Sequence, residues 1–181
     1  MCKYKKIGVF CSASSNVKEV YMTAAKEVGE YIGSNGCELV YGGSAMGMME
    51  VVAKAVKENG GKVTGVVPQV LMDKGVASEY IGHLIVCKDL TDRKSIILKN
   101  SDIMIALPGG VGTMDEVFTV MAGVTLGYHK KRIIFYNTDG FWTPLTDYLR
   151  ILYKEYFIRN QPHQLYDLAN NLDELAIILN R

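Results

Sequence analysis

A glycine-rich turn carries the clearest chemical signal in the chain. Residues 108–113 read Pro-Gly-Gly-Val-Gly-Thr and lie between an apolar run of strand length and a helical pattern. Glycines let the backbone approach a ligand closely, and the free N–H groups and dipole at a helix start favour an anion. The alternative is a tight strand-to-helix turn that needs glycine for packing alone. The predicted phosphate site comprises Gly109, Gly110, Val111, Gly112 and Thr113.

A carboxylate follows this turn at a spacing that is consistent with two different roles. Glu116 stands three residues after Thr113, which fits a capping box, in which the glutamate reaches back to the N–H of the capping residue. The same position puts a carboxylate within one helical turn of the predicted phosphate. We expect Glu116 to take part in the chemistry and the adjacent Asp115 to point to solvent.

Two cations stand before the strand that leads into the phosphate loop. Arg93 and Lys94 begin the helical pattern of residues 93–100. Cations at a helix start oppose the helix dipole and bring no stability there, so their placement indicates a ligand. A solvated surface pair is the alternative. Arg93 is a candidate catalytic residue, and Lys94 is a candidate substrate contact.

A second glycine-containing loop follows an earlier strand pattern. Residues 42–49 match the G-x-x-x-x-G half of a P-loop, but Met48 and Met49 stand at its lysine and serine/threonine positions. Triphosphate chemistry with magnesium is therefore disfavoured. Gly42 and Gly43 remain candidate substrate contacts.

The loop of residues 11–16 contains no glycine, which disfavours a dinucleotide-binding fold. Ser12 in this loop is a candidate ligand contact. Turn and helix-capping roles explain this serine equally well.

The apolar pattern that positions these residues alternates between strands and helices. Strand-like runs cover residues 6–11, 37–41, 62–67, 84–87, 102–107 and 132–136, and helical periodicity covers 17–32, 46–58, 93–100, 113–126, 143–157 and 172–179. This alternation predicts one α/β domain over residues 1–181, a Rossmann-like doubly wound parallel sheet with helices on both faces.

Right-handed crossovers bring the loops after the strands to one edge of such a sheet. The loops 11–16, 41–47 and 107–113 are therefore predicted to converge on one site. Residues 70–78 show no clear periodicity and are a candidate lid or entry loop.

Composition narrows the class of protein. A chain of 181 residues fits one domain, since chains usually split only beyond roughly 250 residues. The formal charge of +1 lacks the basic excess that nucleic-acid binding needs. Four cysteines without a C-x-x-C pair suggest neither a zinc site nor a disulfide framework and suit a cytoplasmic location. No apolar run is long enough to predict a membrane span or a signal peptide.

The segment Pro-Gly-Gly-Val-Gly-Thr-Met-Asp-Glu at residues 108–116 resembles the P-G-G-x-G-T-x-x-E motif of the Lonely Guy family, the cytokinin riboside 5′-monophosphate phosphoribohydrolases, which are often labelled lysine decarboxylases. Asp92-Arg93-Lys94 resembles the R-K part of its companion motif, and residues 41–49 resemble its G-G-x-x-x-G-x-M segment. The resemblance implies that the glycine loop holds a 5′-phosphate and that Arg93 and Glu116 are the catalytic pair. It also implies a Rossmann-like fold, a homodimer or an assembly of dimers, and no metal.

The chain departs from the family pattern at three places. Leu90-Thr91 stand where the family usually has M-H, Gly75 where a glutamate is common, and Ala122-Gly123 where a T-W pair is common. We expect these changes to surround the base and ribose rather than the phosphate.

The predicted reaction is hydrolysis of the N-glycosidic bond of AMP or an N6-prenylated relative, giving free base and ribose 5-phosphate. Such cleavage builds cationic character on the sugar and negative charge on the base. Glu116 would stabilise the sugar and either activate water or attack C1′, and Arg93 would act electrostatically because arginine is too basic to donate a proton readily. No cofactor is expected, and no lysine has a recognisable pyridoxal-phosphate motif. The alternative is a non-catalytic nucleotide-binding protein that resembles the molybdenum-cofactor carriers.

Overall fold

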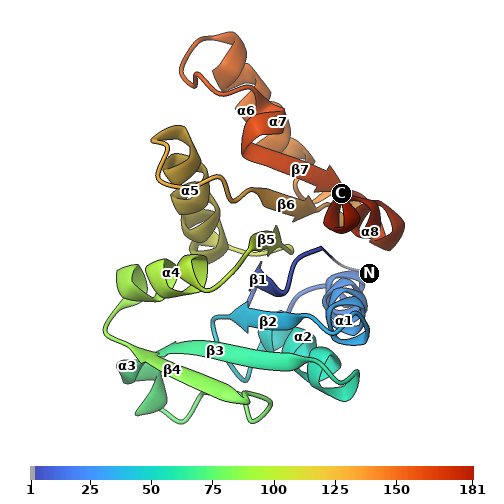
Figure 1. Cartoon of the computed structure of the whole chain (residues 1–181), viewed down its shortest axis with the longest axis vertical. Coiled ribbons are helices and arrows are strands. Elements are labelled where there is room, and N and C mark those ends of the chain that lie inside the picture. The colour runs from blue at the N-terminus through green and yellow to red at the C-terminus, as the bar shows by residue number, and fades with distance from the viewer. Residues whose placement is uncertain (1–2) are drawn as a thin grey trace.

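Seven short strands form one parallel sheet in the computed structural model, which describes residues 3–181 (Figure 1). Their order is β4-β3-β2-β1-β5-β6-β7, and every neighbouring pair is parallel. The strands are β1 Lys6–Phe10, β2 Glu38–Tyr41, β3 Lys62–Pro68, β4 His83–Cys87, β5 Ile103–Ala106, β6 Ile133–Tyr136 and β7 Tyr166–Ala169. The doubly wound parallel sheet predicted from the alternation is confirmed.

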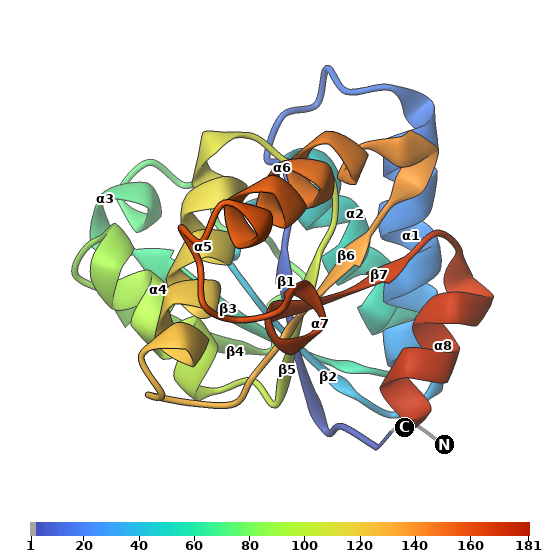
Figure 2. The same cartoon turned by 90° about the horizontal axis from the view of Figure 1, so that it is seen from above.

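Helices cover both faces of the sheet, as Figure 2 shows from above. One core lies between the sheet and α1 (Glu19–Ser34), α2 (Gly47–Glu58) and α8 (Leu172–Asn180). The other lies beneath α4 (Leu90–Lys99), α5 (Val111–Thr125) and α6 (Thr143–Lys154). Three short helices complete the described chain: α3 Gln69–Met72, α7 Pro162–Leu165 and the 3-10 helix η1 Thr138–Gly140. No helix within residues 3–181 has the length and apolarity to cross a membrane.

The strand order reverses between β1 and β5, which lie side by side with Phe10 in register with Ala106. Sheets of this kind bind ligands outside the carboxyl ends of the strands at such a reversal. The loops after β1 and β5 meet there, because the Ser12 N–H donates to the Pro108 carbonyl at 3.2 Å. The predicted convergence of these two loops is confirmed.

Two helices begin earlier than the sequence pattern suggested. The helix expected at residues 93–100 begins at Leu90, because the Asp89 side chain accepts a hydrogen bond from the Asp92 N–H at 2.8 Å and caps it. The helix expected from residue 113 begins at Val111. As a result, Arg93 and Lys94 lie inside α4, and Thr113 lies inside α5, instead of at the start of each helix.

Strand β7 was missed, since its sequence Tyr-Asp-Leu-Ala has no clear alternation and it lies at the edge of the sheet. The candidate lid or entry loop over residues 70–78 is held at its second half by backbone hydrogen bonds. The Ala45 N–H donates to the Val76 carbonyl at 2.8 Å, and the Ser78 N–H donates to the Gly43 carbonyl at 2.9 Å. These bonds fix residues 76–78 on the loop after β2.

Candidate active site

A pocket of about 270 Å³ opens at the carboxyl edge of β1 and β5, at the strand reversal. It brings together residues from four separate parts of the chain, which are Cys11, Ser12, Ala13, Met49, Arg93, Gly110, Gly112, Thr113 and Glu116. Six of these were sequence candidates. The structure therefore joins the glycine loop, the arginine and the glutamate in one place.

The glycine loop is an open helix start. A Cβ atom added at Gly110 or Gly112 would meet no heavy atom within 4 Å, so the packing explanation does not account for these two glycines. Gly109 differs, because an added Cβ would lie 2.1 Å from Thr113 Oγ1 and the loop could not close against the helix. Gly110 is the N-cap of α5, and no side chain caps this helix. Its first N–H groups and its dipole are available to an anion.

Glu116 does not cap the helix, so the capping-box reading is wrong. The cap position belongs to Gly110, and Thr113 is the third residue of α5. Glu116 lies one turn further on with 7% of its surface exposed. Burial raises the pKa of this carboxyl from 4.5 to about 7, against the lowering effect of Arg93. Glu116 is consequently a buried acid that exchanges its proton near neutral pH, as a general base requires.

Arg93 is an internal residue of α4 with 9% of its surface exposed, so the reading as a solvated surface residue is wrong. Its Nε donates to the Val66 carbonyl at 3.1 Å, and its Nη2 donates to the Gly42 carbonyl at 2.6 Å. These bonds hold the guanidinium across the ends of β2 and β3. The side chain is fixed before any substrate arrives.

Gly42 and Gly43 lie behind Arg93 and are not part of the pocket lining. A Cβ added at Gly42 would lie 1.7 Å from Arg93 Nη2, so only glycine lets the guanidinium reach the carbonyl. Gly43 has a φ of +74°, and an added Cβ would lie 2.3 Å from Val67 Cγ2. The structure gives Gly42 a role in seating Arg93, whereas Gly43 lets the loop after β2 pack closely against Val67 of β3.

Lys94 pairs with Asp115 rather than facing the pocket. Its Nζ lies 2.7 and 2.8 Å from the two Asp115 carboxylate oxygens. The pair joins α4 to α5 next to Arg93 and Glu116. Asp115 also raises the pKa of Glu116, and Lys94 lowers it. Asp115 is exposed to solvent, as expected, and its carboxylate also forms this ion pair.

Ser12 lines the pocket, but its Oγ also accepts a hydrogen bond from the Ser14 N–H at 3.0 Å. The turn role of this serine is confirmed, and its place in the pocket lining keeps it a candidate ligand contact. Three residues that line the pocket were not among the sequence candidates, Cys11, Ala13 and Met49. Burial raises the pKa of the Cys11 thiol, followed in size by the effect of Glu116, so the thiol stays neutral. The sequence could have indicated Cys11 as a site residue, because it directly follows an apolar strand whose carboxyl end borders the predicted site.

The departures from the family pattern lie away from this pocket. None of Gly75, Leu90, Thr91, Ala122 and Gly123 is part of its lining. A Cβ added at Gly123 would lie 2.3 Å from His129 Nε2, so the imidazole fills the space beside this glycine.

Opposite shifts of the Glu116 pKa are expected from the two members of the Lys94–Asp115 pair. Lys94→Gln removes a cation and should raise this pKa above about 7, whereas Asp115→Asn removes an anion and should lower it. Carbon-13 NMR titration of the glutamate side chains would measure both shifts. Lys26→Gln, which breaks a distant exposed pair with Glu30, is the matched control and should leave the titration unchanged. Shifts of the same sign in both variants would contradict this electrostatic account.

The fold and the site together define a doubly wound α/β protein with an open, uncapped helix start beside a buried acid. The family model described as "Possible lysine decarboxylase" matches residues 49–179. The chain is 36% identical over 174 residues to the cytokinin riboside 5′-monophosphate phosphoribohydrolase LOG5 of Arabidopsis thaliana, covering 96% of this chain and 76% of that protein. It is 34% identical over 177 residues to the enzyme LOG of Oryza sativa subsp. japonica, covering 98% and 73%. The chain belongs to this family, the Lonely Guy (LOG) family.

Solved structures share the fold. The Moco carrier protein from Chlamydomonas reinhardtii superposes with a TM-score of 0.74 at 23% identity, covering 97% of this chain and 95% of that chain. The molybdenum cofactor binding protein from Rippkaea orientalis superposes with a TM-score of 0.72 at 22% identity, with the same coverage. At these identities the likeness shows the architecture alone.

Proposed function

We propose that this protein is an enzyme that hydrolyses the N-glycosidic bond of a purine nucleoside 5′-monophosphate, AMP or an N6-prenylated AMP, to free base and ribose 5-phosphate. The observation that carries the proposal is the buried Glu116, with a pKa of about 7, in one pocket with Arg93 and an open helix start. The names of the relatives, which are phosphoribohydrolases of cytokinin riboside 5′-monophosphates, support it.

The phosphate binds at the start of α5 in this proposal. The N–H groups of Val111, Gly112 and Thr113 lie in the first turn of the helix, and no side chain caps this turn. The space beside Gly110 and Gly112 is open. The sugar then lies between this turn and Glu116, one helical turn further along α5. Val111 contributes its backbone only, since its side chain is 86% exposed.

The chemistry needs negative charge near C1′ and a route for one proton. In its ionised form Glu116 stabilises the cationic sugar and accepts a proton from the attacking water, whose hydroxide forms the new bond at C1′. The electron pair of the broken bond leaves with the base, which takes up the proton. Arg93 offsets negative charge on the departing base or the phosphate, and its bonds to two carbonyls hold it in one position.

The direct test is chromatography of the products after incubation with AMP and with N6-isopentenyl-AMP. Free base and ribose 5-phosphate in equal amounts are expected from at least one of the two substrates. Failure to detect free base after long incubation at high protein concentration would contradict the proposal. Tight binding of a nucleotide or pterin without turnover would instead favour a carrier, for which the structural neighbours, at 22–23% identity, give no separate support. Decarboxylation is not proposed, since no lysine of residues 3–181 lines the pocket.

We further propose that the protein is a cytoplasmic homodimer. A stripe of exposed apolar side chains on α5, Val111, Met114 and Phe118, runs beside the pocket, with Leu126 just beyond the helix. Met121 is 4% exposed and belongs to the core, so only part of the apolar pattern after the phosphate loop is free for a partner. An exposed stripe of this kind is typical of a protein–protein interface.

Sedimentation should give twice the chain mass of 20.1 kDa at micromolar concentration, and Phe118→Asp should shift the protein toward the single-chain mass. Phe118 is 43% exposed, so the substitution costs little within one chain. Phe157→Asp is the matched control, since Phe157 is 79% exposed on a different part of the surface. Sedimentation of the unmodified protein as a single chain would refute the dimer.

A further inference from the structure

Trp142 directs its indole N–H to the strand that leads into the glycine turn. Its Nε1 donates to the Ala106 carbonyl at 3.0 Å, and the side chain is fully buried. Ala106 is the last residue of β5 and stands four positions before Gly110, the N-cap of α5. The pairing of β5 with β6 ends at the register between Ala106 and Phe135. The indole therefore adds a contact at the point where the pairing with β6 stops.

The loop after β1 holds the other side of the same segment. The Leu107 N–H donates to the Phe10 carbonyl at 2.9 Å, and the Ser12 N–H donates to the Pro108 carbonyl at 3.2 Å. The chain is thus bonded to a neighbour on each side directly before the glycine turn. Restraint from both sides limits how far the turn can move.

A buried asparagine holds Trp142 in place. The Trp142 backbone N–H donates to Asn137 Oδ1 at 2.8 Å. Asn137 Nδ2 donates to Thr143 Oγ1 at 3.1 Å and to Asn170 Oδ1 at 3.0 Å, so both ends of the buried amide are bonded. Asp139, with a φ of +54°, helps to reverse the chain between Asn137 and Trp142. A buried network that is fully bonded makes the position of the indole specific.

Aromatic contacts fix the orientation of the indole ring. The Trp142 ring centroid lies 4.9 Å from that of Phe135 and 5.0 Å from that of Phe141. The Phe141 ring in turn lies edge-on to Tyr21 of α1, at 5.6 Å between centroids. Trp142 also belongs to the same core cluster as Val117 on the buried face of α5. One side chain therefore links the end of β5 to the core beneath the helix that follows the glycine turn.

We propose that Trp142 is a positioning residue for the phosphate turn, residues 108–113. Its indole N–H fixes the end of β5, so that the turn and the first N–H groups of α5 are already in place when a phosphate binds. A site that is ordered in advance loses less freedom on binding and therefore binds more tightly. The inference rests on the proposed phosphate site at the start of α5 and not on cleavage of the glycosidic bond.

Biosynthetic replacement of tryptophan tests the indole N–H, because the chain contains one tryptophan and this residue alone is changed. Benzothienylalanine keeps the shape of the side chain with sulfur in place of the N–H, whereas 4-fluorotryptophan keeps the N–H. Ribose 5-phosphate is the ligand for isothermal titration calorimetry, since it has no base to release. We expect the benzothienyl protein to bind it about fivefold more weakly, which is the order of magnitude that one hydrogen bond supplies. Trp142→Phe should show the same loss, and the 4-fluorotryptophan protein should bind as the unmodified protein does.

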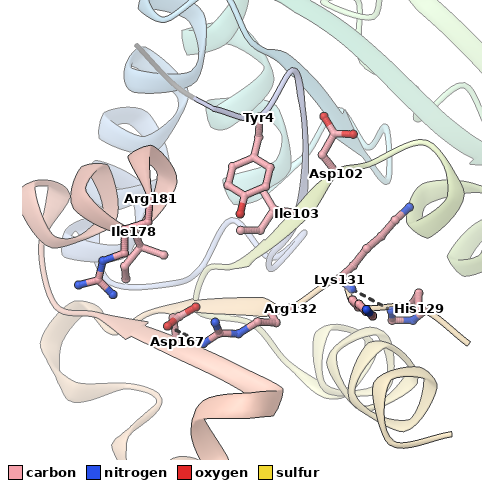
Figure 3. A pocket seen from close by; sticks show the side chains of 10 residues that line it. Tyr4, Asp102, Ile103, His129, Lys131, Arg132, Asp167, Ile178 and Arg181 are labelled. Atoms are coloured by element: carbon pink, nitrogen blue, oxygen red, sulfur yellow. Dashed lines mark hydrogen bonds and ion pairs between the residues drawn. The ribbon is translucent and has the colours of Figure 1, made fainter. Parts of the chain in front are cut away.

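Two variants control for a general loss of stability. Leu149→Ala opens a cavity in the same core cluster, from α6, and leaves the indole N–H in place. Asp167→Asn removes the ion pair with Arg132 at the opposite, amino edge of the sheet, which Figure 3 shows. Both should keep the affinity for ribose 5-phosphate. Urea denaturation would check that each protein is folded under the conditions of the titration.

Three results would overturn the proposal: an unchanged affinity in both the benzothienyl protein and Trp142→Phe, an equal loss in Leu149→Ala, or no binding of ribose 5-phosphate to the unmodified protein. Release of adenine from AMP is measured separately. A protein that binds ribose 5-phosphate with the expected dependence on Trp142, and yet releases no base, would contradict the proposed hydrolysis and leave the role of Trp142 supported.

Discussion

Glu116→Gln should lower the turnover of the nucleoside monophosphate at least a hundredfold, while its binding stays within about threefold. The loss corresponds to about 3 kcal/mol or more in the barrier, because glutamine keeps the shape of the side chain but neither carries negative charge nor accepts a proton. The proposed phosphate site at the start of α5 is not altered by this change. Steady-state kinetics and calorimetric binding of AMP would measure the two effects.

Stability gives an independent readout of the same variant. The pKa of Glu116 is raised by folding from 4.5 to about 7, so its ionised form destabilises the fold. Folding stability attributable to this group is present at low pH and is lost as the pH rises from about 4.5 to about 7. Above pH 7 the glutamine variant should therefore be more stable than the unmodified protein by up to about 3 kcal/mol. Glu79→Gln, at an exposed position outside the helices and strands, should change neither turnover nor stability. Full activity in Glu116→Gln would remove this residue from the mechanism.

Arg93→Met should abolish measurable turnover and also weaken the fold. The methionine fills part of the space but leaves the Val66 and Gly42 carbonyls without their donor. A buried acceptor without a partner costs about 1–3 kcal/mol, so we expect a loss of roughly 2–5 kcal/mol in the free energy of unfolding. Urea denaturation would measure this loss, and turnover would be assayed under conditions in which the variant is folded.

Arg93→Lys separates the charge from the geometry. Lysine keeps the positive charge but cannot present the planar fork that reaches both carbonyls, so it should restore little of the stability. Arg159→Met, at an exposed arginine, is the control and should keep both stability and turnover. A stable Arg93→Met variant would show that the two carbonyl bonds contribute nothing, and an active one would exclude Arg93 from the reaction.

The layer architecture could be predicted from the sequence because each buried strand is a short apolar run and each helix has one apolar face. The glycine loop and Glu116 could be placed near each other because they lie within one helical turn. Their relation to Arg93 could not be derived from spacing alone, since Arg93 is 23 positions before Glu116 and on another helix; it came from the resemblance of the motifs.

The roles of individual polar residues were harder to predict because they depend on contacts between distant segments. Gly42 looked like part of a phosphate loop, yet its carbonyl accepts a hydrogen bond from a side chain 51 positions away. Lys94 looked like a substrate contact, yet its partner is Asp115 on the next helix. The helix start at Leu90 depends on an aspartate cap that the apolar periodicity does not register.

The hydrogen bonds from Arg93 to two backbone carbonyls also predict which residues evolution would retain in a descendant that no longer needed the reaction. An inactive descendant would still keep the arginine, because losing it would weaken the fold. The buried glutamate has no such protection, since its ionised form costs stability and its loss would be favourable. Among relatives with this arrangement, the arginine alone is thus weak evidence of an enzyme, and retention of the glutamate is the better indication that selection still acts on catalysis.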